Sequence, residues 1–257
     1  MSSMKLYYTD DDLFELANQL MTDLVGIVVQ QAKLENIQDK LYLILADNGL
    51  TAVVDGFKPF HLDIFYNEFI AKRRSILNRD LLLGALNFTK LKNIDNLSVL
   101  DMTGGLGRDS ILFALAGFNV TISEINPYLV VILRYLAQTF FSILGNINVI
   151  YANGFEVLQS REFDFVYYDP MFEDGKHALA KKDMQIIDKF IAYYNYATSN
   201  LIDNNDIIKL ARLKSHKFIV KRDNKQEYLV DKLKPTYQKK GKTIRFDVYQ
   251  GLNKLSS

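Results

Sequence analysis

The pattern of apolar and polar positions changes near residue 98. From there on, short apolar runs typical of buried strands alternate with longer segments whose apolar residues recur at helical spacing. The strand candidates are SVLDMT, NVTISE, INVIYAN, DFVYYDP and KFIVKR. The helix candidate DSILFALAGF separates the first two, and NPYLVVILRYLAQTFFSI is the next helix candidate. This alternation predicts right-handed βαβ units and a parallel sheet.

The remaining segments show other patterns. DDDLFELANQLMTDL predicts an amphipathic helix with acids at its start, and KLYLILADNGLTAVVDG places two apolar runs around the turn signal Asn48-Gly49. LDIFYNEFIAKRRSILNRDLLLGALNF predicts one or two helices, and PTYQKKGKTIRFDVYQG predicts a final antiparallel hairpin. We therefore expect a small N-terminal α+β domain in residues 1–70 and an α/β domain in residues 71–257.

Composition narrows the class of protein. The chain has 257 residues, of which 49% are hydrophobic and 24% charged, so it can bury a sizeable core. It has no cysteine, which excludes disulfides and cysteine-ligated metal sites, and its three histidines are scattered, so we expect no metal. The first residues lack the pattern of a signal peptide, and no apolar run could span a bilayer. We expect a cytoplasmic protein that does not enter a membrane.

The net charge of +1 hides an asymmetry along the chain. Residues 1–70 carry 4 basic and 11 acidic side chains, whereas residues 205–257 carry 14 basic and 5 acidic ones. A basic end on a nearly neutral protein suggests a polyanion as partner. A solvated, lysine-rich surface explains the same numbers equally well.

The segment VLDMTGGLGRDS follows the first strand of the α/β part. Gly104, Gly105 and Gly107 allow the backbone to turn tightly and to approach a ligand, and the next helix points its N–H groups at the loop. In an open α/β sheet this is where a nucleotide-like cofactor binds. The dinucleotide pattern would need a glycine where Ser110 stands, and no Gly-Lys-Ser/Thr phosphate loop is present.

Two acids indicate which cofactor the loop would hold. Glu124 ends the second strand, 23 residues after Asp101, where a carboxylate can accept both hydroxyls of a ribose. Asp101 lies beside the glycine loop, where it could meet a cationic ammonium group. A cofactor with a ribose and an amino-acid tail but no phosphates fits this pattern best, namely S-adenosylmethionine (SAM).

The segment FDFVYYDPMFED ends the fourth strand with an acid, a proline and an aromatic residue. A turn alone explains Asp-Pro, but the motif would stand beside the first strand and the methyl donor. Enzymes that methylate amino groups carry such a motif there. Asp169 and the backbone carbonyl before or at Pro170 could accept the amino N–H bonds, while Phe172 stacks on the base. These three residues are the catalytic candidates.

The motifs LDMTGGLGRDS, YYDPMF, ALAKKDMQ, IVKR and KGKTIRFDVYQG, in this order, resemble the ribosomal RNA small subunit methyltransferase J family from about Asp63 to Gly251. The resemblance implies a Rossmann-like class I methyltransferase sheet. It also implies methylation of the 2-amino group of a guanine in 16S ribosomal RNA, with that RNA or the small ribosomal subunit as partner. By position, it implies cofactor contacts at Arg108, Asp109, Glu124, Ile125, Asn153, Gly154 and Asp169.

This sequence departs from the family pattern in two places. The family tends to have Glu-Arg where this chain has Glu124-Ile125, so only a backbone or apolar contact fits at 125. It also tends to have a glycine run where this chain reads AKRRSILNR.

The basic residues that we predict to contact RNA phosphates are Arg73, Arg74, Lys181, Lys182, Lys221, Arg222 and Lys240.

Two other classes of function remain open at this point. An NAD-dependent oxidoreductase shares the glycine loop and the acid, but the third glycine and an obvious proton donor are lacking. A non-catalytic RNA-binding assembly factor on a methyltransferase fold is the second alternative. Against it, the glycine loop, Glu124 and the DPMF motif are all intact.

Overall fold

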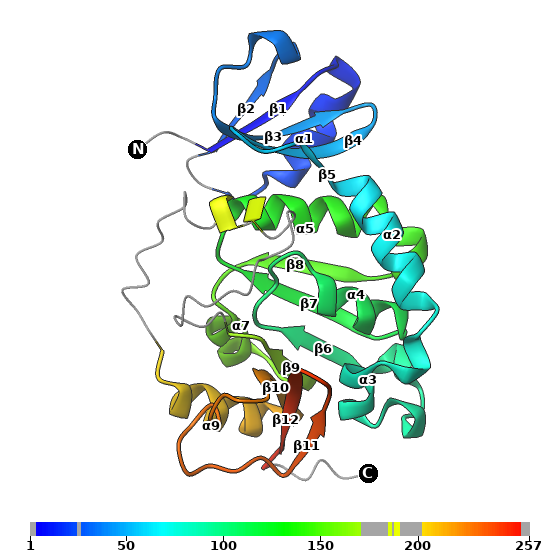
Figure 1. Cartoon of the computed structure of the whole chain (residues 1–257), viewed down its shortest axis with the longest axis vertical. Coiled ribbons are helices and arrows are strands. Elements are labelled where there is room, and N and C mark those ends of the chain that lie inside the picture. The colour runs from blue at the N-terminus through cyan, green and yellow to red at the C-terminus, as the bar shows by residue number, and fades with distance from the viewer. Residues whose placement is uncertain (1–3, 25–26, 171–184, 187, 191–201, 253–257) are drawn as a thin grey trace.

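The structure is a computed structural model, and it describes residues 4–24, 27–170, 185–186, 188–190 and 202–252 (Figure 1). Phe172, Lys181 and Lys182, which the sequence proposes for catalysis and RNA binding, lie outside these residues.

A seven-stranded sheet with the strand order β11-β12-β10-β9-β6-β7-β8 forms the centre of the chain. Its strands are β6 (Ser98–Asp101), β7 (Asn119–Glu124), β8 (Ile147–Tyr151), β9 (Phe163–Tyr168), β10 (Ser215–Asp223), β11 (Tyr237–Lys240) and β12 (Ile244–Gln250). The strands from β8 to β10 pair in parallel, whereas β12 pairs antiparallel with both β10 and β11. The predicted parallel sheet and C-terminal hairpin are confirmed.

Helices cover both faces of this sheet (Figure 1). They are α3 (Leu81–Leu86), α4 (Arg108–Leu115), α5 (Pro127–Thr139), α6 (Phe141–Leu144), α7 (Gly154–Ser160) and α9 (Asn204–Lys214). Because side chains alternate along a strand, Val99 joins the buried cluster of α3, α4 and α5, whereas its neighbour Leu100 joins that of α7 and α9. This two-sided cover explains why the strands read as nearly continuous apolar runs.

The N-terminal part has a sheet of its own, in the order β2-β1-β3-β4-β5. It consists of β1 (Met4–Tyr8), β2 (Ile27–Gln31), β3 (Leu41–Ala46), β4 (Gly49–Val54) and β5 (Phe60–His61), with helix α1 (Phe14–Leu20). The hairpin predicted around Asn48-Gly49 joins β3 to β4. Short 3-10 helices span Asp11–Leu13, Leu34–Asn36, Leu77–Arg79, Phe88–Lys90 and Ile94–Asn96.

The two sheets share one continuous buried cluster of apolar side chains. Arg134 of α5 donates to the carbonyl of Leu20 at 3.2 Å and pairs with Asp23 at 2.7 Å. The boundary predicted at residue 70 falls inside α2 (Leu62–Arg74), which packs on β4 and on α4. The division into two domains therefore stays a prediction. In the part of the chain that the structure describes, no helix is long and apolar enough to cross a membrane.

Candidate functional site

The glycine loop joins the carboxyl end of β6 to α4. Gly105 and Gly107 have φ angles of +53° and +71°, in the left-handed region that favours glycine. Gly104 is required for a different reason, since a Cβ there would lie 2.6 Å from a methyl carbon of Ile122. A Cβ at Gly105 would meet no atom within 4 Å, so the space beside this residue is open. The loop thus offers its backbone to a ligand.

Glu124 fastens this loop to the end of β7. Its Oε2 accepts from the Gly105 N–H at 2.8 Å, and its Oε1 accepts from the N–H groups of Ile125 and Asn126 at 2.9 and 2.8 Å. Burial raises the pKa of Glu124, and the three backbone N–H groups oppose that rise. Because a carboxylate oxygen can accept two hydrogen bonds, Oε2 retains capacity for a hydroxyl. This capacity fits one hydroxyl of a ribose, and the contact of Glu124 with both hydroxyls stays a prediction.

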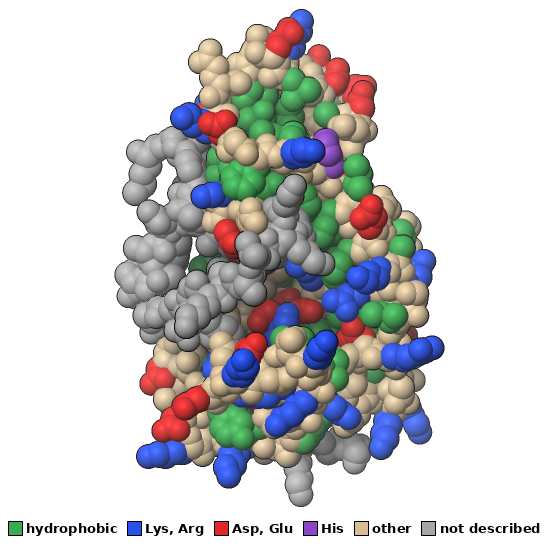
Figure 2. All heavy atoms as spheres, viewed as in Figure 1, with side chains coloured by type: hydrophobic (Ala, Val, Ile, Leu, Met, Phe, Trp, Pro, Cys, Tyr) green, Lys and Arg blue, Asp and Glu red, His purple; other side chains and the backbone are tan. Residues whose placement is uncertain are grey.

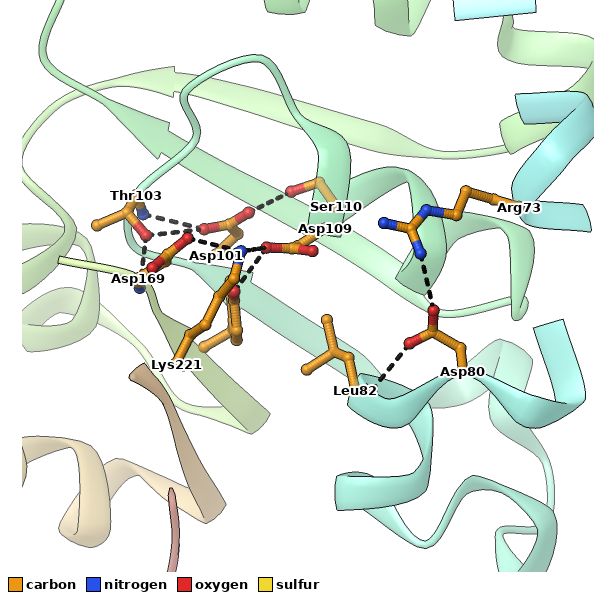
Figure 3. A network of polar contacts seen from close by, with 10 residues as sticks. Arg73, Asp80, Leu82, Asp101, Thr103, Asp109, Ser110, Asp169 and Lys221 are labelled. Atoms are coloured by element: carbon orange, nitrogen blue, oxygen red, sulfur yellow. Dashed lines mark hydrogen bonds and ion pairs between the residues drawn. The ribbon is translucent and has the colours of Figure 1, made fainter. Parts of the chain in front are cut away.

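Asp101, the last residue of β6, is buried beside the loop, with 1% of its surface exposed. Its Oδ2 accepts from the Ser110 hydroxyl at 2.6 Å, and its Oδ1 accepts from the Thr103 N–H at 3.0 Å (Figure 3). Burial raises the pKa of Asp101 to about 7. The geometry gives Asp101 a role in holding the loop against α4, and its contact with a cofactor ammonium group stays a prediction.

Helix α2 covers the start of α4. The Arg108 guanidinium lies 5.3 Å from the centroid of the Phe65 ring, and the Tyr66 hydroxyl donates to the carbonyl of Leu106 at 3.1 Å. Arg108 is thereby positioned between the glycine loop and α2. Its proposed contact with the cofactor is compatible with this position and stays a prediction.

Asn153 and Gly154 shape the beginning of α7. The Asn153 side chain accepts from the Phe155 N–H at 2.9 Å and so caps the helix. A Cβ on Gly154 would lie 2.6 Å from the Cβ and 2.8 Å from the backbone of Met102, directly after β6. Both residues thus hold α7 close to the carboxyl edge of the sheet, and their contacts with a cofactor stay predictions.

A cluster of charged groups lies at the same edge, where β9, β10 and α4 meet (Figure 3). The Asp169 N–H donates to the Thr103 hydroxyl at 2.9 Å, which joins the end of β9 to the glycine loop. Lys221 Nζ donates to Asp169 Oδ2 and to Asp109 Oδ2, both at 2.9 Å. The Tyr167 hydroxyl also donates to Asp109 Oδ2, at 2.6 Å.

The protonation states of this cluster depend on one another. Burial raises the pKa of Asp169; Lys221 opposes this effect, and the charge of Asp109 adds to it. Burial alone would also raise the pKa of Asp109. The charge of Lys221 and the hydrogen bonds from Lys221 and Tyr167 outweigh burial, so the pKa of Asp109 is lowered. Burial alone would lower the pKa of Lys221, but the charges of Asp109 and Asp169 outweigh this effect and raise the pKa of its ammonium group. Lys221 and Asp109 are therefore both charged at neutral pH.

The basic residues predicted to contact RNA divide into two groups. Arg74 and Lys240 are exposed, and Arg73 is half-buried and pairs with Asp80 at 3.1 Å. Arg222, in contrast, is buried and donates from Nε and Nη2 to the carbonyl of Glu227 at 3.1 and 2.9 Å. Lys221 is engaged by the two carboxylates, so its contact with RNA, like that of Arg222, stays a prediction.

The distribution of charge is visible on the surface of the molecule. Figure 2 shows Lys and Arg side chains gathered on the half of this face that carries β11, β12 and α3, with acidic side chains in a hollow near its centre. Among the described residues, no group of three or more His, Cys, Asp or Glu is arranged to hold a metal ion.

Comparisons with known proteins agree with this geometry. The family model described as "Putative SAM-dependent methyltransferase" matches residues 28–251. The chain is 31% identical over 221 residues to "Ribosomal RNA small subunit methyltransferase J" of Francisella philomiragia subsp. philomiragia, covering 82% of this chain and 88% of that protein. It is 37% identical over 162 residues to the protein of the same name from Francisella tularensis subsp. novicida, covering 60% and 65%.

A solved structure shows the same fold. The crystal structure of a SAM-dependent methyltransferase from Neisseria gonorrhoeae superimposes with a TM-score of 0.70 at 22% identity, covering 99% of this chain and 100% of that one. The family match supports SAM as the cofactor, rather than NAD. The chain therefore belongs to the ribosomal RNA small subunit methyltransferase J family of SAM-dependent methyltransferases.

Proposed function

We propose that the chain transfers a methyl group from SAM to the 2-amino group of a guanine in the RNA of the small ribosomal subunit. The observation that carries this proposal is the position of Asp169. Its carboxylate stands at the carboxyl end of β9, and its N–H is bonded to Thr103 of the glycine loop at 2.9 Å. The names of the similar proteins support small-subunit ribosomal RNA as the substrate.

The cofactor side of the site is provided by the ends of β6, β7 and β8. SAM supplies an electrophilic methyl group when it is bound. Glu124 is the residue that we assign to a ribose hydroxyl, because Oε2 holds only one N–H, that of Gly105. We assign the space beside Gly105 to the amino-acid tail, and the edge formed by Asn153 and Gly154 to the base.

The acceptor side is provided by Asp169 and Pro170. A guanine amino group is a poor nucleophile, because its lone pair is delocalised into the ring. Hydrogen bonds from its N–H groups to Asp169 and to the adjacent backbone carbonyl would turn that lone pair toward the methyl group. Pro170 fixes its own φ and stiffens the backbone at this point. Phe172 is proposed to stack on the base, which is worth about 1–3 kcal/mol for such contacts.

RNA would approach from the basic end of the molecule. The exposed Arg74 and Lys240, with Arg73, are proposed to contact phosphates, which position an RNA without reading its sequence. Lys181 and Lys182 are proposed to contribute from the segment after the DPMF motif. Residues 1–70 carry a net charge of −7, which would repel phosphates and leave the N-terminal unit outside the contact.

The experiment is methyl transfer in vitro with ribosomal RNA from a strain that lacks the gene. Purified protein, labelled SAM and either naked 16S ribosomal RNA or small subunits are combined, and the RNA is mapped by mass spectrometry. We expect one guanine to gain a methyl group on its 2-amino nitrogen. Incorporation at another atom would refute the assignment of the acceptor. Tight RNA binding without any incorporation would favour the non-catalytic assembly factor.

A further inference from the structure

The ammonium group of Lys221 is shared by the carboxylates of Asp109 and Asp169. Lys221 Nζ lies 2.9 Å from Asp109 Oδ2 and 2.9 Å from Asp169 Oδ2. The two oxygens are therefore separated by no more than twice this distance. Asp109 Oδ2 is held from another side by the Tyr167 hydroxyl, at 2.6 Å. Lys221 thus connects a fixed carboxylate in α4 to the carboxylate that we assign to the substrate.

The sheet fixes the backbone on which this contact depends. Val220 pairs with Tyr168 in the parallel ladder of β10 and β9, so Lys221 and Asp169 follow at the same level. On its other side Lys221 pairs with Phe246 of β12. Because β10 is an inner strand of the sheet, its backbone cannot move away from Asp169 without breaking ladder hydrogen bonds.

We propose that Lys221 is a positioning residue for methyl transfer, holding Asp169 Oδ2 so that Oδ1 can accept an N–H of the guanine amino group, and keeping Asp169 ionised beside Asp109. The inference rests on the proposed function of Asp169. It assigns to Lys221 a role inside the site rather than on the RNA surface.

The charges around Asp169 explain why a cation is needed at this place. The charge of Asp109 in α4 acts on Asp169, and the charge of Asp169 acts on Asp101 of β6 and on Tyr167 of β9. Arg73 of α2 acts on Asp109. Without Lys221, the carboxylates of Asp109 and Asp169 would face each other uncompensated, and one would take up a proton. A protonated Asp169 would donate a hydrogen bond where the amino group needs an acceptor.

The test compares Lys221→Met, which removes the charge at similar length, with Lys221→Arg, which keeps it. The maximal rate of RNA methylation is measured against pH at saturating SAM, and SAM affinity is measured by calorimetry. For Lys221→Met we expect the acidic limb of the pH–rate profile to shift to higher pH by at least about one unit. At a given pH within that limb the rate then falls about tenfold. SAM affinity should change less than about threefold, and Lys221→Arg should restore the position of the limb.

The matched control is Lys217→Met, on the same face of the same strand. Lys217 Nζ donates to the carbonyl of Leu86 at 2.8 Å and touches no carboxylate of the cluster. This variant should keep the wild-type position of the limb even if it is less stable. A second charge test, Asp109→Asn, removes a negative charge beside Asp169 and should move the limb to lower pH, which keeps the inference testable if Lys221→Met does not fold.

A readout without RNA separates this inference from the proposed function. Carbon-13 NMR titration of the aspartate carboxyls in the free protein, assigned with Asp169→Asn and Asp109→Asn, measures their protonation directly. In Lys221→Met the carboxyl of Asp169 should titrate at higher pH than in the wild type. Unchanged titration and an unshifted limb would overturn the role of Lys221. A wild type that methylates no guanine would refute the function, while the titration still decides the role of Lys221 in keeping Asp169 ionised.

Discussion

Replacing Glu124 with glutamine removes one charge and one acceptor from the residue that fastens the glycine loop. The carboxylate accepts three backbone N–H groups at 2.8 to 2.9 Å, one from Gly105 and two from the residues after β7. A glutamine has only one oxygen, so its NH₂ must face at least one N–H group. The less costly orientation keeps the two N–H groups after β7 bonded and leaves that of Gly105 without its acceptor.

The magnitude follows from the lost contact. A hydrogen bond to a charged acceptor contributes about 1.5–3 kcal/mol, so the free energy of unfolding should fall by about that amount. For a chain of this length, this corresponds to a Tm that is lower by about 3–12 °C. If Glu124 also accepts a ribose hydroxyl, SAM binding loses a similar free energy, which weakens the affinity roughly 10- to 150-fold.

The assay is isothermal titration of SAM into the wild type and the variant at 25 °C, with thermal unfolding of the free proteins in parallel. Glu156→Gln is the matched control, because Glu156 is an exposed carboxylate in the first turn of α7 at the same edge of the sheet. The control should bind SAM like the wild type. An affinity of Glu124→Gln within about twofold of the wild type would refute the assignment of the ribose site, whatever its Tm.

Three further predictions concern other parts of the site. Asp169→Asn should lower the maximal rate of methyl transfer at least about 10²-fold with SAM affinity nearly intact, and a normal rate in a single-turnover assay would place the acceptor site elsewhere. Gly154→Ala places a Cβ 2.6 Å from Met102 and should cost about 1–3 kcal/mol in thermal unfolding, whereas Gly84→Ala, where a Cβ meets nothing within 4 Å, should be neutral or stabilising. The pKa of Asp101 is raised to about 7 in the folded protein, so between pH 4 and 7 the folded state binds this proton more tightly than the unfolded state, and stability falls as pH rises. Asp101→Asn should flatten that fall, and denaturant titrations at pH 4.5 and 7 that show the same difference as the wild type would contradict this assignment.

The central sheet could be predicted because each of its strands carries a local signal. The runs around Val99 and Phe165 are short and apolar. Gly104 follows the first run and Pro170 follows the second, and both residues disfavour a continued strand. The first strand of the N-terminal sheet was not predicted. Its partners begin at Ile27 and Leu41, and parallel pairing at such separations leaves no turn signal in the sequence.

Sequence reasoning named the candidate site residues but not all of their partners. Asp101 and Asp109 stand out because they flank the glycine loop, yet their side chains contact Ser110 and Lys221, which spacing alone does not indicate. The position of Lys221 depends on the pairing of Val220 with Tyr168, which is known only once the strands are assembled. The charged end of the apolar run KFIVKR made Lys221 a candidate for RNA contact, but it did not indicate the contact with Asp169.

The core shared by the two sheets has a consequence for the order in which the chain is made. The N-terminal strands leave the ribosome first, but Arg134 and Tyr135, which bind Leu20 and Asp63, are added about seventy residues or more after the first sheet is complete. At about 5–20 residues per second, the apolar side chains of this unit that share a buried cluster with α5 would stay exposed for several seconds. The net charge of −7 on residues 1–70 makes neighbouring nascent chains repel each other during this time, which opposes their association through these apolar side chains.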